Sequence, residues 1–186
     1  HVGIIHSESH KVEYREEVSD GEKKQIFDTP VGSIYTIHKS SGKTWYKAKS
    51  FIEDVDDIKV MQYIFEDRTF SLNMDHYNNI EAQIGDAGIP TPSGPLTPIQ
   101  SLLQHDCGVE NFTYLLFDYE DEMRSLMDAM HQSNLQQYKL MAQAPDNVHA
   151  IFAYEDTSTT VMGPSWYNEY CKEQIDEYYK LYGAQK

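Results

Sequence analysis

Residues 148–160 read VHAIFAYEDTSTT, an apolar run that ends abruptly in two adjacent carboxylates. Glu155 and Asp156 close the run, and four hydroxyl residues follow them. A short, almost continuously apolar run is typical of a strand covered on both faces of a parallel sheet. In folds built from such sheets, ligands bind at the carboxyl ends of the strands. The stretch therefore predicts a strand over residues 148–154 that delivers two acids to a site.

The predicted site consists of the last residue of this strand and the polar residues after it. A carboxyl group beside an apolar wall can have its pKa raised and then act as an acid or a base. Glu155 and Asp156 are thus the predicted catalytic residues, and Tyr154, Thr157 and Ser158 are predicted to bind a polar substrate. The opposing interpretation is a loop leading into a helix, with solvated acids and with hydroxyls that satisfy the backbone. The residues alone leave both interpretations open.

The segments on either side of the predicted strand have helical patterns. Residues 119–144 carry an apolar stripe at helical spacing, made of Met123, Leu126, Met127, Met130, Leu140 and Met141. Gly163-Pro164 predicts the start of a last helix, and Gly183 predicts its end. The order helix, strand, loop, helix after residue 118 predicts an α/β fold.

Residues 10–51 have a different, antiparallel β pattern. HKVEYREEV alternates apolar and polar side chains, and Asp20-Gly21 is a strong signal for a hairpin turn. Further strands are predicted over KKQIFDT, SIYTIHK and TWYKAKSF, with turns at residues 29–32 and at SSGK. This region is predicted to be a compact antiparallel insertion.

Short helices are predicted after residue 51. DDIKVMQYIFED has apolar residues at helical spacing, and Asp54 or Asp56 is predicted to cap it. MDHYNNIEAQIG predicts a second helix that ends at Gly85. A loop rich in Pro and Gly leads to Thr97-Pro98, which predicts the start of a short helix over PIQSLLQH.

Composition excludes several classes of protein. The 186 residues hold 15 Lys+Arg and 30 Asp+Glu, which gives a formal net charge of −15. This charge disfavours nucleic acid or an anionic membrane as a partner, because binding phosphates needs clustered cations. No apolar run approaches the roughly 20 residues that span a bilayer. The first residues do not resemble a signal peptide, and two cysteines make no disulfide framework, so we expect a cytoplasmic protein.

Two short motifs resemble functional sites, but each lacks residues that such a site needs. SSGKT at residues 40–44 ends like a phosphate-binding loop, but Ile37 stands where the motif needs glycine, and a strand follows instead of a helix. His105 and Cys107 have donor types that bind zinc. Two ligands do not complete a zinc site, so a structural role is favoured and no metal ligand is predicted.

Several segments, in order, resemble the uroporphyrinogen decarboxylase superfamily, and within it the branch of methyltransferase-like proteins related to corrinoid-dependent methyltransferases. These segments are DTPVGSIYTIHK, DDIKVMQYIFED, GDAGIPTPSGPLTPIQSLL, GVENFTYLLFDYEDEMRSLM and FAYEDTSTTVMGPSWYNEYCKEQIDEYYKLYGAQK. The last is the closest match, with a strand, an acidic loop rich in hydroxyls, and a helix start. Together the segments cover most of the chain.

The resemblance implies a (β/α)₈ barrel with its site at the carboxyl ends of the strands. Such a barrel takes roughly 250 residues. The expectation is therefore a partial barrel over residues 1–186, an internal fragment with residues 10–51 as the β insertion and residues 52–186 as the barrel part. The chain starts at His1, which also suggests a trimmed piece. In the barrel, Glu155 and Asp156 would lie at the mouth.

The resemblance also implies a function for the intact protein, while the fragment alone is expected to be inactive. A methyl group would move from a small substrate by way of a corrinoid protein, with zinc activating the acceptor thiol. The zinc ligands of the family follow a later strand and are not matched in this chain. A corrinoid protein and a second copy of the chain are candidate partners. The alternatives are a tetrapyrrole decarboxylase, although its arginine-rich motif is not matched here, and a non-catalytic α/β binding or structural module.

Overall fold

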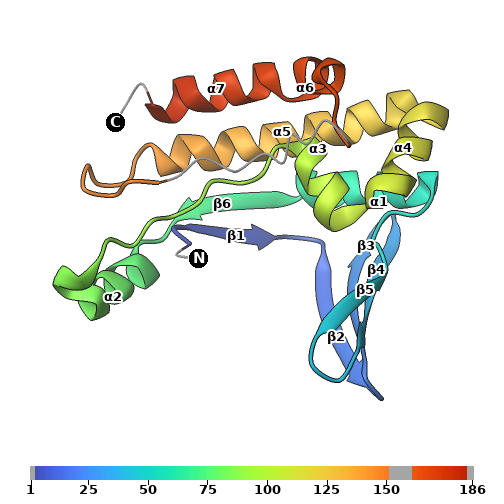
Figure 1. Cartoon of the computed structure of the whole chain (residues 1–186), viewed down its shortest axis with the longest axis horizontal. Helices are drawn as coiled ribbons and strands as arrows, with labels where there is room; N and C mark the ends of the chain where they lie inside the picture. Colours follow the sequence, from blue (N-terminus) through green and yellow to red (C-terminus); the bar gives the residue numbers. More distant parts are fainter. Residues whose placement is uncertain (1–2, 151–160, 184–186) are drawn as a thin grey trace. The chain divides into compact units, whose positions relative to one another are not determined.

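The computed structural model describes residues 3–150 and 161–183 (Figure 1). The helices and strands of the described chain, in order, are β1 (Ile5–Ser9), β2 (Glu13–Ser19), β3 (Glu22–Thr29), β4 (Gly32–Ser40), β5 (Trp45–Lys49), α1 (Val55–Glu66), β6 (Arg68–Leu72), α2 (Asp75–Ile84), the 3₁₀ turn η1 (Gly85–Ala87), α3 (Pro98–Ser101), the π-helix η2 (Leu102–Asp106), α4 (Val109–Asp118), α5 (Glu120–Met141), α6 (Pro164–Tyr170) and α7 (Lys172–Gly183). The expectation of a mixed α/β fold with a small antiparallel sheet is confirmed.

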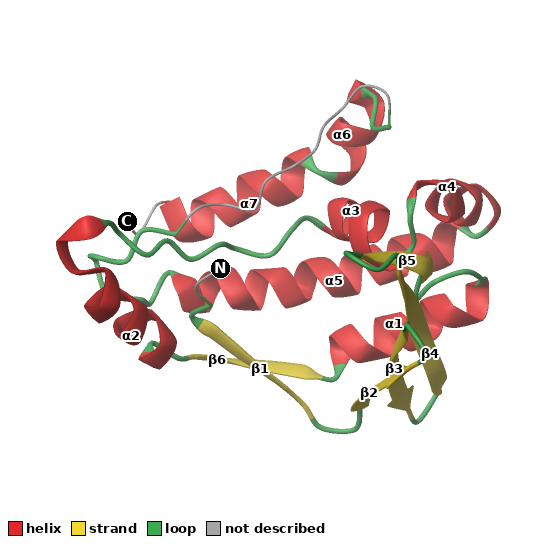
Figure 2. Ribbon diagram, turned by 60° about the horizontal axis from the view of Figure 1, so that its bottom comes forward, coloured by secondary structure: helices red, strands yellow, loops and turns green. Residues whose placement is uncertain are grey.

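The predicted β region forms a four-stranded sheet in the order β2-β3-β4-β5 (Figure 2). All neighbouring strands are antiparallel. Asp20 and Gly21 both have positive φ, of 47° and 75°, so the tight turn between β2 and β3 forms where the sequence predicts it. The turn at SSGK joins β4 to β5 as predicted, and β5 is shorter than the predicted strand TWYKAKSF.

Helix α1 begins with a capping box. The Asp54 side chain accepts hydrogen bonds from the backbone N–H groups of Asp56 and Asp57, at 3.0 and 3.1 Å. The Asp57 carboxylate in turn accepts from the Asp54 N–H. These bonds satisfy donors that a helix start leaves unpaired. Of the two predicted caps, Asp54 is the one that the structure has.

The described chain divides into two compact units. Unit 1 comprises His1–Glu8, Thr69–Pro98 and His131–Lys186, and unit 2 comprises Ser9–Arg68 and Ile99–Met130. Unit 2 contains the four-stranded sheet, α1, the short helices α3 and η2, and α4. Unit 1 contains α2, α6, α7 and the second half of α5.

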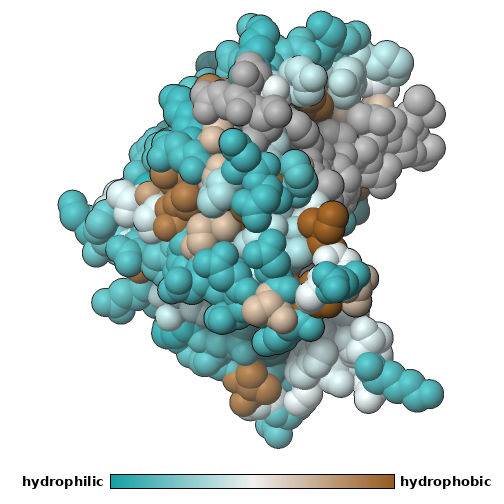
Figure 3. All heavy atoms as spheres, turned by 90° about the vertical axis from the view of Figure 1, so that its left-hand side faces the viewer, coloured by the Kyte–Doolittle hydropathy of each residue, from teal (hydrophilic) through white to brown (hydrophobic). Residues whose placement is uncertain are grey.

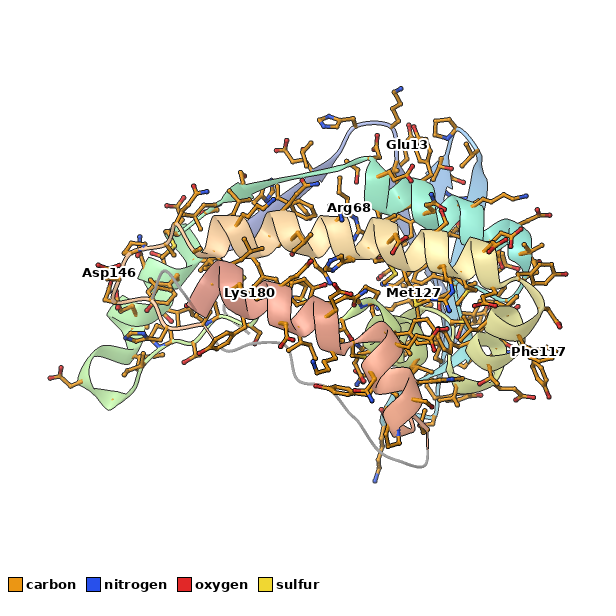
Figure 4. All side chains as sticks on the ribbon, turned by 90° about the horizontal axis from the view of Figure 1, so that it is seen from above. Glu13, Arg68, Phe117, Met127, Asp146 and Lys180 are labelled. Atoms are coloured by element: carbon orange, nitrogen blue, oxygen red, sulfur yellow. The ribbon has the colours of Figure 1, made fainter. Side chains whose placement is uncertain are left out.

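The core of unit 1 is rich in tyrosine. Its buried members are Ile4, Tyr77, Tyr138, Met141, Ala142, Ala144, Val148, Tyr178 and Tyr182. The rings of Tyr138 and Tyr178 are stacked, with centroids 4.5 Å apart and planes at 20°. Such pairs add about 0.5–1.5 kcal/mol beyond the burial of their area. This core packs α7 against the second half of α5, and the two helices lie side by side in Figures 1, 2 and 4.

The core of unit 2 uses the predicted apolar stripe of the long helix. Met123, Leu126, Met127 and Met130 of α5 are all buried, as predicted. Further along the helix, Met141 is buried in unit 1, whereas Leu140, which was predicted to belong to the same stripe, is only half-buried. Helix α4 buries Phe112, Leu115 and Leu116 but leaves Phe117 88% exposed, and its ring points outwards in Figure 4.

The structure contains several elements that the sequence did not predict. β1 and β6 pair with each other, and neither was predicted. Helix α4 was also missed. The predicted last helix is two helices, α6 and α7, with a distortion at Cys171. Backbone bonds from Cys171 N to Tyr167 O and from Ile175 N to Cys171 O still run through the distortion.

No helix within the described residues is long and apolar enough to cross a membrane. On the face drawn in Figure 3, the described surface is mostly hydrophilic, and hydrophobic residues appear in small separate groups.

Candidate functional site

The five predicted site residues, Tyr154 to Ser158, lie outside the described residues, which stop at Ala150 and resume at Val161. Residues 148–150, the described part of the predicted strand, have no strand structure. The remainder of that predicted strand also falls outside the described chain. What the structure defines is how the chain is held immediately before and after residues 151–160.

The chain before residue 151 is fixed by Tyr182 of α7. The Tyr182 hydroxyl accepts a hydrogen bond from the backbone N–H of Ala150 at 2.8 Å and donates to the carbonyl of Val148 at 3.4 Å. Val148 is buried, and its N–H bonds to the carbonyl of Pro145 at 2.9 Å. One side chain on α7 thus sets the path of the backbone that leads into the predicted site.

The chain after residue 160 is fixed by the distorted turn between α6 and α7. Met162 is 1% exposed, and its sulfur lies 3.7 Å from the Sγ atom of Cys171, which is also buried. Helix α6 then begins at Pro164, where the missing N–H of proline costs nothing. Both ends of the 151–160 stretch are therefore attached to the α6–α7 segment of unit 1.

A polar network joins α7 to α5 in the same unit. His131 of α5 bonds through Nδ1 to the hydroxyl of Tyr178 and through Nε2 to the carboxylate of Glu177, both at 2.8 Å. Asn134 donates to the same Tyr178 hydroxyl at 3.2 Å. An ionised carboxylate only accepts, so Nε2 carries a proton; a neutral ring then accepts the Tyr178 proton at Nδ1.

The extended stretch before α3 packs against this network. The Asn134 amide donates to the carbonyl of Leu96 at 2.7 Å, and the Tyr138 hydroxyl donates to the carbonyl of Pro95 at 3.2 Å. Gly94 lies so close to Tyr138 that an added Cβ would be 2.6 Å from its ring carbon Cζ. Only glycine allows this approach, and the stretch runs alongside α5 in Figures 1 and 2.

The network can hold a proton between a phenol, an imidazole and a carboxylate. The His131 side chain is 13% exposed and that of Glu177 is 43% exposed, so the carboxylate is the part of the network most open to water. Tyr178 is buried. The same hydrogen bonds fix α7 on α5, and α7 carries Tyr182, which holds the chain before residue 151.

Two further polar atoms of α5 and α7 are buried without a hydrogen-bond partner in the described chain. They are Oγ of Ser133, whose residue is 2% exposed, and Oε1 of Gln174. Buried polar groups in folded proteins are normally paired. The hydroxyl of Tyr77, in the core of the same unit, is a third such atom within the described residues.

Unit 2 contains His105 and Cys107, whose His-x-Cys spacing resembles that of a zinc-binding motif. The Cys107 thiol is buried, and burial raises its pKa to about 12, with nearby Asp106 adding to the effect. Zinc binds the thiolate, which this environment disfavours, whereas His105 is exposed. Within the described residues no group of three or more His, Cys, Asp or Glu side chains could hold a metal ion.

Asp106 is a perturbed acid that the sequence does not reveal. Burial raises the pKa of its carboxyl group, and the bond from the Ser101 hydroxyl at 2.8 Å only partly opposes this. The carbonyl of Asp106 accepts from the Ile52 N–H at 3.0 Å. The Lys47 ammonium donates to the carbonyls of Gln104 and His105. These contacts tie η2 to the end of β5 within unit 2.

The functional candidates missed by the sequence are His131, Asn134, Glu177 and Tyr178. One signal was present, because His131, Asn134 and Tyr138 are spaced at i, i+3 and i+7 and so share a face of the long helix.

The chain was compared with protein-family models, curated proteins and solved structures. No match was found in any of the three comparisons.

Proposed function

We propose that this chain forms part of a uroporphyrinogen decarboxylase-like enzyme of the methyltransferase-like branch. The enzyme would move a methyl group from a small substrate to a corrinoid protein. Glu155 and Asp156 would be its catalytic carboxylates, and Tyr154, Thr157 and Ser158 would bind the substrate. One observation carries the proposal: an apolar run ends in adjacent acids and hydroxyls, within segments that follow the order of that family. A partial (β/α)₈ barrel is the fold that belongs to this proposal.

The chain around residues 151–160 supports such a site. Tyr182 holds Val148 and Ala150 on one side, and Cys171 contacts Met162 on the other. Binding and catalytic side chains work best when a rigid scaffold fixes the segment that carries them. We propose that α7 is this scaffold and that His131 and Asn134 are positioning residues, because they hold Tyr178 one turn before Tyr182.

The acids would contribute proton transfer. When a methyl group leaves a nitrogen, oxygen or sulfur atom, the electron pair of the broken bond stays on that atom, which then takes up a proton. Glu155 or Asp156 in its protonated form would supply that proton, and general acid catalysis of this kind is worth about 10²–10⁴ in rate. Zinc, which the resemblance implies, does not fit the described residues, because the Cys107 thiol is buried with a pKa of about 12.

The test compares variants of the protein produced from its complete reading frame. Glu155→Gln and Asp156→Asn keep size and hydrogen bonding but remove the proton. Thr160→Val, in the same stretch, is the matched control. Methyl transfer from methylated amines, ethers and thioethers to free cob(I)alamin is followed by visible absorption. The proposal predicts a loss of about 10²-fold or more for one or both acid variants, and near-normal turnover for the control.

Three results would contradict this proposal. If wild-type protein consumes a porphyrinogen and transfers no methyl group, tetrapyrrole decarboxylation takes its place. If both acid variants turn over as fast as wild type, the acids have no catalytic role. A protein without turnover on any of these substrates would support a binding or structural module instead.

A further inference from the structure

The charges of unit 2 are unevenly distributed along the chain. Residues 29–52 contain four lysines and none of the 30 acidic residues of the protein. This stretch comprises strands β4 and β5 and the turn that joins them. The opposite edge of the sheet, β2, reads EYREEVS and contains three glutamates. A strongly acidic protein thus keeps one hairpin free of carboxylates.

The outer end of this hairpin combines lysines with exposed aromatic rings. We call it the basic tip and define it as Lys39, Lys43, Trp45, Tyr46 and Lys47, all of which are exposed. Trp45 is 45% exposed and Tyr46 is 53% exposed. Tryptophan and tyrosine are enriched at the centres of protein interfaces, where they contribute much of the binding energy. Trp45 and Tyr46 are neighbours on β5, so their side chains point to opposite faces of the hairpin, Tyr46 on the face of Lys39 and Trp45 on the face of Lys47. Each face of the basic tip therefore combines one exposed ring with a lysine.

The lysines of the basic tip have only weak acidic partners. Lys47 donates to the backbone carbonyls of Gln104 and His105 and is also attracted to the carboxyl group of Asp106, whose pKa is raised by burial. The carboxylate of Glu22 lies 4.0 Å from Lys39, between two side chains that are 50% and 42% exposed. Such surface pairs contribute little, about 0–1 kcal/mol. His38 lies beside the tip, and its pKa is below the usual value. Burial is the largest cause, and repulsion from the ammonium groups of Lys47 and Lys23 adds to it. This repulsion agrees with a positive local potential.

The turn that carries the tip is held in one shape. Ser41 N–H donates to the carbonyl of Thr44 at 2.8 Å, and Gly42 N–H donates to the Ser40 hydroxyl at 3.1 Å. Gly42 has a φ of +88°, which a residue with a side chain rarely adopts. A turn ordered in advance loses less entropy when it binds.

We propose that the basic tip is a docking surface for an acidic polypeptide segment of a partner protein. The lysines would pair with carboxylates of the partner, and Trp45, on one face of the hairpin, would pack against its apolar side chains. A nucleic acid fits less well, because the net charge of −15 repels a long polyanion, whereas a short acidic segment can meet the tip alone. Docking here would be independent of the chemistry proposed for Glu155 and Asp156.

The experiment measures binding of a short fluorescein-labelled peptide of Glu and Leu by fluorescence anisotropy at about 50 mM and about 200 mM salt. Lys39→Gln with Lys43→Gln removes two charges from the tip and leaves Lys47 in place. The matched control, Lys59→Gln with Lys172→Gln, removes two charges from lysines that are 65% and 60% exposed elsewhere. Trp45→Ala tests the aromatic contribution. Circular dichroism checks that every variant is folded.

The proposal predicts that the tip variant binds about three- to tenfold more weakly than wild type and loses part of the salt dependence. Trp45→Ala should weaken binding about fivefold or more, and the control should bind nearly as wild type. Equal weakening by the control, or no binding of the peptide by wild type, would overturn the proposal. An oligothymidylate of equal charge that binds as tightly as the peptide would overturn it too, in favour of a nucleic-acid site.

Discussion

Nδ1 of His131 lies 2.8 Å from the hydroxyl of Tyr178, although the two residues are 47 positions apart in the sequence. The bond joins the second half of α5 to α7, within a core where Tyr178 also stacks on Tyr138. One turn further along α7, Tyr182 holds the backbone at Val148 and Ala150. The placement of the chain before the predicted site therefore depends on a histidine that lies outside that site.

His131→Ala should lower the free energy of unfolding by about 1–3 kcal/mol, because it removes a hydrogen-bond partner from the buried hydroxyl of Tyr178 and from the carboxylate of Glu177. His76→Ala, at an exposed position of α2 in the same unit, should change it by about 0.5 kcal/mol or less. Urea unfolding followed by circular dichroism measures both values. Similar small losses for the two variants would show that the network contributes nothing to holding α7.

Gly94→Ala should lower the free energy of unfolding by about 1–3 kcal/mol, because its Cβ would overlap the buried ring of Tyr138. The ring cannot move away freely, since it is stacked on Tyr178 and its hydroxyl is bonded to Pro95. Gly3→Ala is the control, because a Cβ there meets nothing within 4 Å. Thermal melts of the two variants give the comparison, and an unchanged melting temperature for Gly94→Ala would contradict the close packing.

Asp106→Asn should stabilise the protein at neutral pH. Burial raises the pKa of Asp106, so the folded state disfavours its ionised form. This penalty is present above the folded pKa and disappears as the pH falls below the pKa of the unfolded chain, about 3.9. The advantage of the variant should therefore shrink in acid.

Urea unfolding at neutral pH and at a pH near 4 checks this sign. Asp128→Asn, at an exposed position of α5, is the control and should show a smaller difference between the two pH values. A variant at position 106 that is less stable than wild type at neutral pH would mean that the ionised carboxylate is favourable. In that case the attraction of Asp106 to Lys47 and Arg68 would outweigh its burial.

The elements predicted correctly are those whose signals are local. The β2–β3 hairpin follows from alternation and from Asp20-Gly21, and α1 follows from its spacing and from Asp54. β1 and β6 were missed because they pair across about 60 residues of sequence. β1 is mostly exposed and shows no alternation, and the alternation of β6 covers only five residues. Pairing at long range is not encoded in any short window.

The same limit applies to the site. The sequence singled out Glu155 and Asp156, where an apolar run changes into acids. It could not single out Glu177 or Tyr178, because their importance comes from a histidine on another helix. Nor could it find the raised pKa of Asp106, since burial of a carboxylate depends on the tertiary packing around it.

The contact between Met162 and Cys171 also has a consequence for oxidative damage. Oxidation of a methionine turns its sulfur into a polar sulfoxide, and a thiol can also be oxidised in steps. Both sulfurs here belong to buried residues, so peroxide should reach them slowly while the protein is folded. Once a sulfoxide forms at Met162, a polar oxygen would occupy this apolar contact and loosen the chain after residue 160. Peroxide would then harm the proposed activity without touching Glu155 or Asp156.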